Sequence, residues 1–422
     1  MSSAAGEAWK SGICAAVSEL RDHLLQISHE LHADPELAFN EHRASARLSG
    51  ELAGAGFTVE RGVGGLDTAF RAELRGSRPG PTVAVLAEYD ALPVIGHACG
   101  HNVIGTSALG AGLALARTGQ DFAGRALVIG TPAEEGGGGK ILLAEAGVFE
   151  DVDVAIMMHP STRNMVARGS LAHSRIDIVF HGKAAHAAGS PDLGINALQA
   201  VIDTFNAING MRLHMRRDAR VHGIITHGGD AVNIIPARAA AKFSVRARDR
   251  AYQRKLVGML QAAAEGAAAA TGARLEWTER RGYDNMVANP TVAQLFAANI
   301  EALGLEVIAP RPDERMGSTD MGDISQIVPA VHAYLAIAPE ETPGHSLEFA
   351  RAAISEAGDA AVLNGAKAMA MTLAELLAQP SLVEQAKAEF DDMRQGGLVA
   401  GLEAWREAGR AYAPLQPGAP QG

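Results

Sequence analysis

Cysteine, histidine and glutamate side chains are concentrated in two short segments of the sequence. The segment H-A-C-G-H-N contains Cys99 and His101, and T-P-A-E-E ends in Glu134 and Glu135. A thiolate and an imidazole two residues apart can reach one metal ion, and both suit zinc. Adjacent carboxylates repel each other, and a bound cation would offset this repulsion. The two segments predict a metal site, although each is also compatible with a structural or solvated loop.

Two further histidines stand in segments that could meet the first two. His159 ends the apolar run V-A-I-M-M-H-P, and His345 lies in the turn P-G-H-S before a helix-like segment. Taken alone, His159 reads as a core residue and His345 as the lead-in to a helix. Taken together, the four segments supply enough ligands for two metal ions and leave one glutamate to act as a base. The combination therefore predicts a dinuclear metal hydrolase.

The elements that must position these residues alternate between strands and helices. The segments 81–90, 125–135 and 152–160 have the continuous apolar cores of strands buried on both faces. Helix-like segments at 103–119 and 140–146 separate them. This order is typical of a parallel α/β sheet, in which sites form beyond the carboxyl ends of the strands. The polar residues at these ends are Glu88, Asp90, Glu134, Glu135 and His159.

A different pattern begins near His173. An alternating strand is followed by a helix, two strands, an Ala-rich helix and a last strand, which is the split β-α-β-β-α-β arrangement. The α/β rhythm then resumes, with a strand at 331–337 and one long helix at 348–377. We predict a catalytic domain from residues 1–172 and 286–380, an inserted domain at 173–285, and a tail at 381–422 that begins as helix and ends as coil.

Composition narrows the class of protein. The 422 residues are 47% hydrophobic and 20% charged, which is normal for a globular chain of two domains. No uncharged apolar stretch of membrane-spanning length is evident, so we expect no membrane partner. The net charge of −11 argues against nucleic acid as a partner. The start of the chain does not read as a secretory signal, and the only cysteines are Cys14 and Cys99, so we expect a cytoplasmic protein.

The motifs also resemble those of a known family. The segments A-E-Y-D-A-L-P, G-H-A-C-G-H-N, P-A-E-E-G, H-G-K-A-A-H-A, V-N-I-I-P-A-R and P-G-H-S are similar to those of dinuclear metallopeptidases and amidohydrolases such as aminoacylases, carboxypeptidase G and auxin-conjugate hydrolases. Their wording is nearest to the branch of aminobenzoyl-glutamate hydrolase and β-alanyl-lysine dipeptidase. The resemblance runs from about Leu31 to Leu377. It implies an α/β catalytic domain, with a mostly parallel sheet and helices on both faces, and an inserted ferredoxin-like α+β lid that also forms a dimer.

The resemblance implies roles for individual residues of the catalytic domain. Glu134 would be the general base, and Asp90 would orient a ligand imidazole. Much of the family has a His-x-Asp sequence on the early strand, whereas this chain has Glu88-Tyr89-Asp90, which leaves the role of Glu88 open. The implied metal ligands are Cys99, His101, Glu135, His159 and His345.

In the inserted domain, the resemblance implies three substrate-binding residues. His186 would reach the active site of the partner subunit and polarise the scissile carbonyl. Asn233 and Arg246 would hold the carboxylate of the substrate, since a guanidinium fork is well shaped for it. The alternative for Arg246 is an ordinary surface salt bridge.

We therefore expect a homodimeric hydrolase with two divalent metal ions per subunit, first zinc and otherwise manganese or cobalt. Its substrate would be an N-acyl amino acid, an aminobenzoyl-glutamate-like conjugate or a dipeptide with a free carboxylate. One alternative is a peptidase for longer chains, which Asn233 and Arg246 argue against. Another is a catalytically silent partner subunit or binding protein of the same fold, which the full ligand set and Glu134 argue against.

Overall fold

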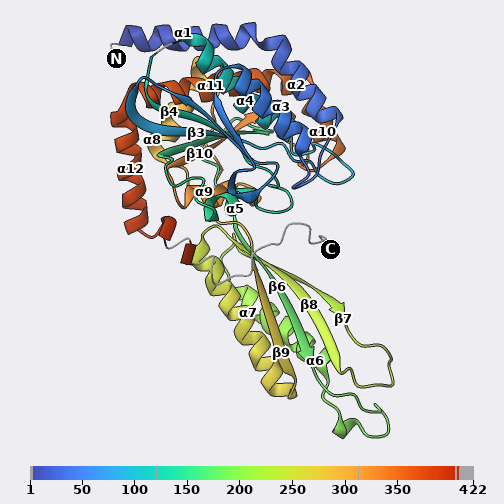
Figure 1. Cartoon of the computed structure of the whole chain (residues 1–422). Helices are drawn as coiled ribbons and strands as arrows, with labels where there is room; N and C mark the ends of the chain where they lie inside the picture. The colour runs from blue at the N-terminus through green and yellow to red at the C-terminus, as the bar shows by residue number, and fades with distance from the viewer. Residues whose placement is uncertain (1–2, 120, 312, 404–405, 408–422) are drawn as a thin grey trace. The chain divides into compact units, whose positions relative to one another are not determined.

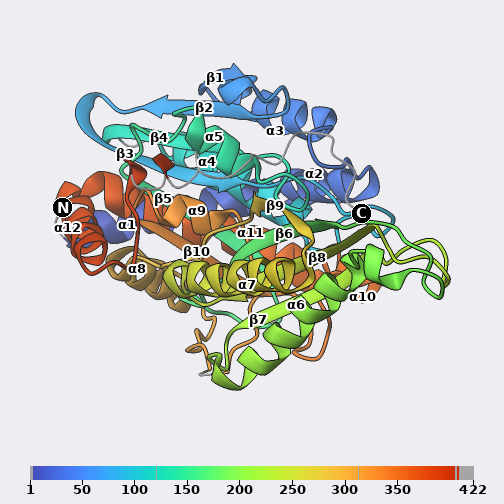
Figure 2. The ribbon, with the colours of Figure 1, turned by 90° about the horizontal axis from the view of Figure 1, so that it is seen from below.

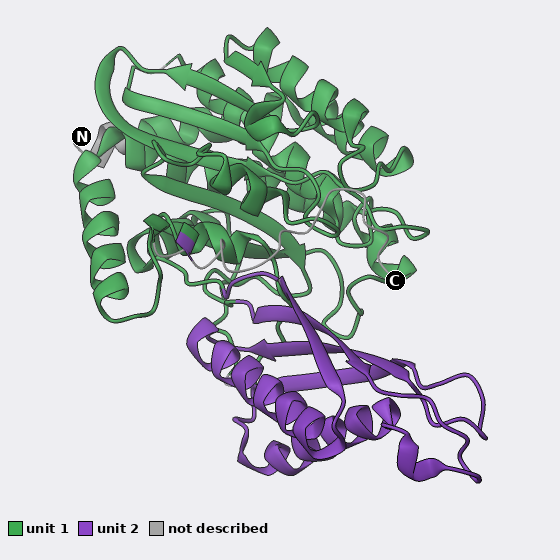
Figure 3. Ribbon diagram, turned by 60° about the horizontal axis from the view of Figure 1, so that its bottom comes forward, with its two compact units in different colours: residues 1–169, 286–406, 416–422 green, residues 170–285, 407–415 purple. Residues whose placement is uncertain are grey.

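The computed structural model describes residues 3–119, 121–311, 313–403 and 406–407. Residues 1–169 and 286–406 form one compact unit, and residues 170–285 form a second (Figure 3). The coil predicted for the end of the chain lies outside the described residues, except near its start.

The first unit is built on a six-stranded sheet in the order β1-β2-β4-β3-β5-β10 (Figure 1). The strands β3, β4, β5 and β10 run parallel, whereas β1 and β2 pair in the antiparallel direction at one side. The carboxyl ends of the four parallel strands thus share one edge of the sheet. The bounds are β1 Thr58–Arg61, β2 Phe70–Arg75, β3 Arg78–Ala87, β4 Ala123–Gly130, β5 Val154–Ser161 and β10 Ala330–Ala336.

Helices cover both faces of this sheet, which confirms the predicted α/β class. The helices α4 (His101–Thr118) and α11 (Glu356–Ala378) pack against each other and against β3, β4 and β5. The helices α5 (Gly139–Glu145) and α9 (Met321–Ser325) lie on the other face (Figure 2). By length and composition α11 could cross a membrane, but 72% of its most apolar 18-residue window is buried, as expected of a core helix.

The remaining helices complete the first unit and differ in part from the prediction. The predicted helix at 348–377 is two helices, because the Ser355 side chain accepts a hydrogen bond from the Gly358 N–H and caps the second one. The strands β1 and β2 were not predicted, since both are short and β1 is mostly exposed. The bounds are α1 Ser3–Glu19, α2 Arg21–Ala33, α3 His42–Gly54, the 3-10 turn η1 Val63–Gly65, α8 Pro290–Ala302, α10 Leu347–Ala352 and α12 Pro380–Gln395.

The second unit is an antiparallel four-stranded sheet in the order β7-β8-β6-β9, with α6 and α7 side by side on one face. Strand residues such as Ile176, Phe180 and Phe243 alternate with more exposed ones and pack against helix residues such as Leu256 in one core. The element order confirms the predicted ferredoxin-like arrangement. The bounds are β6 Ala172–His181, η2 Pro191–Leu193, α6 Ala197–Met211, η3 Arg212–His214, β7 Arg220–His227, β8 Arg238–Ala247, α7 Arg250–Thr271 and β9 Arg274–Arg281.

Candidate functional site

Parallel strands deliver the predicted site residues to one edge of the large sheet. Glu88 and Asp90 follow β3, Glu134 and Glu135 lie in the turn after β4, and His159 lies near the end of β5. Cys99 lies in the loop that follows Asp90, and His101 is the first residue of α4. His345 lies before α10, and its backbone N–H donates to the Ala98 carbonyl at 3.2 Å. This bond ties the distant P-G-H-S turn to the cysteine loop.

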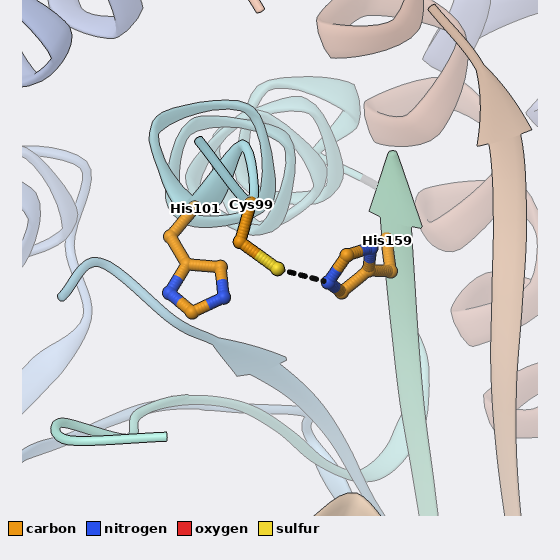
Figure 4. Close-up of side chains that lie close together, drawn as sticks. All are labelled: Cys99, His101 and His159. Carbon is orange, nitrogen blue, oxygen red and sulfur yellow. Dashed lines mark hydrogen bonds between the residues drawn. The ribbon is translucent and has the colours of Figure 1, made fainter. Parts of the chain in front are cut away.

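The thiol of Cys99 faces the imidazole of His159 (Figure 4). The Sγ atom lies 3.5 Å from Nε2, while Nδ1 of the same ring lies 2.6 Å from the Pro160 carbonyl oxygen. Because a carbonyl oxygen only accepts hydrogen bonds, we place the ring proton on Nδ1. The lone pair of Nε2 then points at the thiol. Burial lowers the pKa of His159 to about 4, so this imidazole is neutral near pH 7.

Asp90 holds two parts of the cluster in place. One carboxylate oxygen lies 2.9 Å from Nδ1 of His101, and the other accepts a hydrogen bond from the Glu135 N–H at 2.9 Å. Burial would lower the pKa of His101, but the carboxylates of Asp90 and Glu88 raise it well above its ordinary value. Nε2 of His101 lies 3.3 Å from Glu88 Oε2 without a hydrogen bond between them.

The two adjacent glutamates have different surroundings. Oε1 of Glu135 lies 3.3 Å from His345 Nε2. Burial would raise the pKa of Glu135, but the contact with His345 holds it below its ordinary value. Glu134 lies with one oxygen 3.9 Å from His101 Nε2. Burial, and then the charges of Glu88 and Glu135, raise the pKa of Glu134 well above its ordinary value.

The side chains at this edge fit a centre for divalent cations. Buried atoms of Glu88, His101 and Glu135 have no hydrogen-bond partner among the described residues, and such atoms are costly unless something satisfies them. Thiolate, imidazole and carboxylate donors together suit zinc and similar ions. The groups whose ligand atoms lie within 4.8 Å of one another are Cys99–His101–His159, Cys99–Glu135–His345 and Glu88–His101–Glu134.

Comparison with known proteins identifies the family. Residues 84–375 match the model of peptidase family M20/M25/M40. The chain is 37% identical to Xaa-Arg dipeptidase of Mus musculus over 390 residues, which cover 89% of this chain and 90% of the relative. It is 29% identical to one of the subunits of p-aminobenzoyl-glutamate hydrolase of Escherichia coli, with 90% and 94% covered.

The protein belongs to peptidase family M20/M25/M40. Its fold agrees with that of a dinuclear metal-binding M20 peptidase from Bacillus subtilis, with a TM-score of 0.69, 21% identity and coverage of 85% of this chain and 99% of that one. The predicted resemblance, fold class and enzyme class are therefore confirmed. The M20 chain is a metal-dependent hydrolase, and the assignment of single residues to single roles is treated below as a proposal.

In the second unit of this M20 hydrolase, the structure brings His186 and Asn233 together. The Ala187 N–H donates to the Asn233 carbonyl at 2.9 Å, and the backbone of His186 forms an isolated antiparallel β-bridge with that of Ile234. Nδ1 of His186 accepts bonds from the N–H groups of residues 188 and 189, so the proton of the neutral ring lies on Nε2.

Arg246 does not lie with these two residues. It pairs across the sheet with His173, near the start of β6. Arg246 lies near the last residue of β8, whereas Asn233 precedes the first. Its guanidinium is half-buried and has no hydrogen bond or ion pair with any described residue. Burial, and then the nearby charge of Arg175, lower the pKa of Arg246. This group is suited to receive an anion, whereas the salt bridge considered as an alternative is absent among the described residues.

A buried ion triad beside the cluster was not predicted. The ammonium of Lys140 is fully buried, lies 2.7 Å from Asp320 and also contacts Glu88. The backbone N–H of Lys140 donates to the second oxygen of Asp320 at 3.0 Å. Glu88 thus faces Lys140 with one oxygen and His101 with the other. The only sequence signal was a lysine directly after four glycines, which we interpreted as the start of a helix.

Replacing Lys140 with Met should lower the free energy of unfolding by about 3–5 kcal/mol, because two buried carboxylates would lose their cation. Urea unfolding followed by circular dichroism would measure the change. Lys387→Met is the matched control, since Lys387 pairs with Asp153 on an exposed surface. That variant should lose less than about 1 kcal/mol. Equal losses in the two variants would contradict the importance of the buried triad.

Proposed function

We propose that this M20 enzyme hydrolyses the amide bond of a small substrate with a free carboxylate, such as a dipeptide or an acylated amino acid. The observation that carries the proposal is the convergence of one thiol, three imidazoles and two adjacent carboxylates at one sheet edge. The names of its relatives, a dipeptidase and an aminobenzoyl-glutamate hydrolase, support the substrate class.

In this proposal five residues hold two divalent ions. Cys99 and His101 each belong to two of the ligand groups, so neighbouring groups share side chains. Zinc is the preferred ion because thiolate and imidazole suit it, with manganese or cobalt as alternatives. When bound, the ions supply positive charge that lowers the pKa of a water molecule. The proposed ligands are Cys99, His101, Glu135, His159 and His345.

Glu134 is the proposed general base. Its carboxylate is buried beside His101, and its pKa is raised well above the ordinary value by burial and neighbouring carboxylates. A raised pKa suits a group that must accept a proton from the attacking water and return it to the leaving amine. Asp90 is the proposed positioning residue, since it orients the His101 ring and binds the Glu135 N–H.

The unit at residues 170–285 is the proposed lid and dimerisation domain. Asn233 and Arg246 are the proposed ligands of the substrate carboxylate, and His186 would donate its Nε2 proton to the scissile carbonyl. Asn233 precedes β8, whereas Arg246 lies eight residues after Arg238, or ~26 Å along the strand at about 3.3 Å per residue. One lid is therefore poorly suited to present all three groups to a single site.

A homodimer resolves this separation. In the proposed dimer, Arg246 serves its own subunit, while His186 and Asn233 serve the partner subunit. In a closed twofold dimer, each subunit would contribute His186 and Asn233 to the other in the same way. We also propose a cytoplasmic location, because neither Cys14 nor Cys99 forms a disulfide and free thiols are typical of a reducing compartment.

The carboxylate requirement can be tested with matched substrates. Dipeptides ending in Arg or Lys, aminobenzoyl-glutamate and N-acyl amino acids form the first panel. For the best substrate, the C-terminal amide should show kcat/KM about 10–100-fold lower than the free acid, since hydrogen bonds to charged groups contribute about 1.5–3 kcal/mol. Arg246→Met should remove most of this preference. Equal hydrolysis of acid and amide by the wild type would exclude carboxylate recognition.

Two substitutions separate the base from the ligands. Glu134→Gln should lower kcat by about 10²–10⁴-fold and leave metal content nearly unchanged, because Gln keeps the shape but cannot accept the proton. Cys99→Ala should lower both metal content and rate, because a thiolate ligand is lost. Elemental analysis and steady-state kinetics measure both quantities. Full metal content in Cys99→Ala would remove its ligand role, and an active Glu134→Gln would move the base to another residue.

Mixed dimers test the exchange of His186. Homodimers of His186→Ala and of Glu134→Gln should both be inactive. An equal mixture should recover about a quarter of the wild-type rate, since about half of the dimers are mixed and one of their two sites is intact. Subunit exchange is confirmed by native mass spectrometry. A mixture that exchanges but stays inactive would show that His186 acts within its own chain, whereas an active His186→Ala homodimer would show that His186 is not needed.

A further inference from the structure

The turn that carries Glu134 and Glu135 has a backbone conformation that its sequence does not favour. Ala133 has φ +61°, in the left-handed region where the Cβ of an ordinary residue crowds the backbone. Its carbonyl accepts the N–H groups of Gly137 and Gly138 at 2.9 Å each, which closes the turn. Such a conformation persists only where the surrounding structure imposes it. The orientation of Glu134 therefore depends on what holds Ala133.

The group that holds Ala133 is the carboxylate of Glu41. The Ala133 N–H donates to Glu41 Oε1 at 2.9 Å, across 92 residues of sequence. The Glu41 side chain is fully buried, and its second oxygen accepts the Thr68 hydroxyl at 2.8 Å. Because both groups are buried, loss of the carboxylate would leave the Ala133 N–H without a partner, which is costly.

A second strained residue converges on the same oxygen. Phe39 has φ +63°, and its N–H donates to Glu41 Oε1 at 3.0 Å. Its ring packs directly against Gly137, where a Cβ atom would come within 2.2 Å of a ring carbon. The segment from Phe39 to Glu41 therefore contacts the turn that carries Glu134 and Glu135 through one carboxylate oxygen and one aromatic ring.

We propose that Glu41 is a positioning residue for catalysis, which acts through Ala133 to fix the backbone from which Glu134 projects. It belongs to none of the candidate ligand groups, so it would act without touching metal or substrate. The inference rests on the proposed role of Glu134 as base. A displacement of about 1 Å at a reacting group can cost about 10²-fold in rate, which sets the size of the expected effect.

Two substitutions at Glu41 distinguish the position of its side-chain oxygens from the charge that they carry. Glu41→Gln keeps an oxygen that can accept from both N–H groups, and its amide can donate to the Thr68 hydroxyl. Its kcat should stay within about tenfold of wild type, since a neutral acceptor retains roughly half of the hydrogen-bond strength. Glu41→Asp keeps the carboxylate but withdraws it from Ala133. Its kcat should fall about 10²-fold, with KM nearly unchanged.

Two control variants perturb the same region without touching the Ala133 contact. Glu36 accepts the N–H groups of Arg43 and Ala44 at the start of α3, so Glu36→Ala should lower the melting temperature but not kcat. Thr68→Val removes the donor to the other Glu41 oxygen and should also leave kcat unchanged. Melting temperature and metal content are measured for every variant, and kcat is expressed per metal-loaded subunit.

The relative kcat of the two Glu41 variants tests the proposal. A Gln variant more active than the Asp variant, at equal metal content, supports it. An Asp variant as active as wild type, or a Glu36→Ala variant that loses kcat as strongly, would overturn it. Glu134→Gln is assayed in parallel with the same dipeptide substrate. If Glu134→Gln retains activity, the proposed base is wrong, whereas a wild-type kcat in Glu41→Asp beside an inactive Glu134→Gln rejects only the role of Glu41.

Discussion

Crowding of buried carboxylates is the constraint on which the site depends. Glu88, Asp90, Glu134 and Asp320 are each at most 7% exposed, and Glu135 lies beside them. Like charges in a low-dielectric interior repel strongly, so such a group is stable only with cations in reach. Lys140 supplies part of this charge within the chain, since its ammonium contacts Glu88 and Asp320. The unsatisfied atoms that remain define where further positive charge is most stabilising, and they coincide with the candidate ligand groups.

The same constraint explains why the supporting backbone is unusual. The carboxylates can converge only if the turn after β4 reverses tightly, and Gly139 shows how tightly, since a Cβ there would lie 1.8 Å from the Pro132 carbonyl oxygen. Ala133 and His345 take left-handed conformations in the same region. Strain of this kind commonly lies at functional sites, where surrounding hydrogen bonds hold it. The electrostatic and the backbone requirements therefore meet in the same few residues.

The sequence predicted those features that have a local signature. Apolar strands that end in polar residues predicted the sheet edge, and the alternating pattern after His173 predicted the second unit. The contact between Lys140 and Asp320 has no such signature, because the two residues lie 180 positions apart and each looks ordinary in its own segment. The bond from Ala133 to Glu41 was missed for the same reason. Motifs therefore indicated which residues do chemistry, but not which distant side chains hold them in place.

The two units place different demands on their residues. In the first, each charged side chain is fixed by burial and by several partners, so a change at one position alters the energy of the others. In the second, His186 and Asn233 are exposed, and Arg246 has no partner among the described residues. Residues of this kind can change without a loss of stability, because little in their own unit depends on them. The chemistry proposed for this hydrolase depends on its buried charges, whereas its proposed substrate contacts come from the second unit, where His186 and Asn233 are exposed and Arg246 is half-buried.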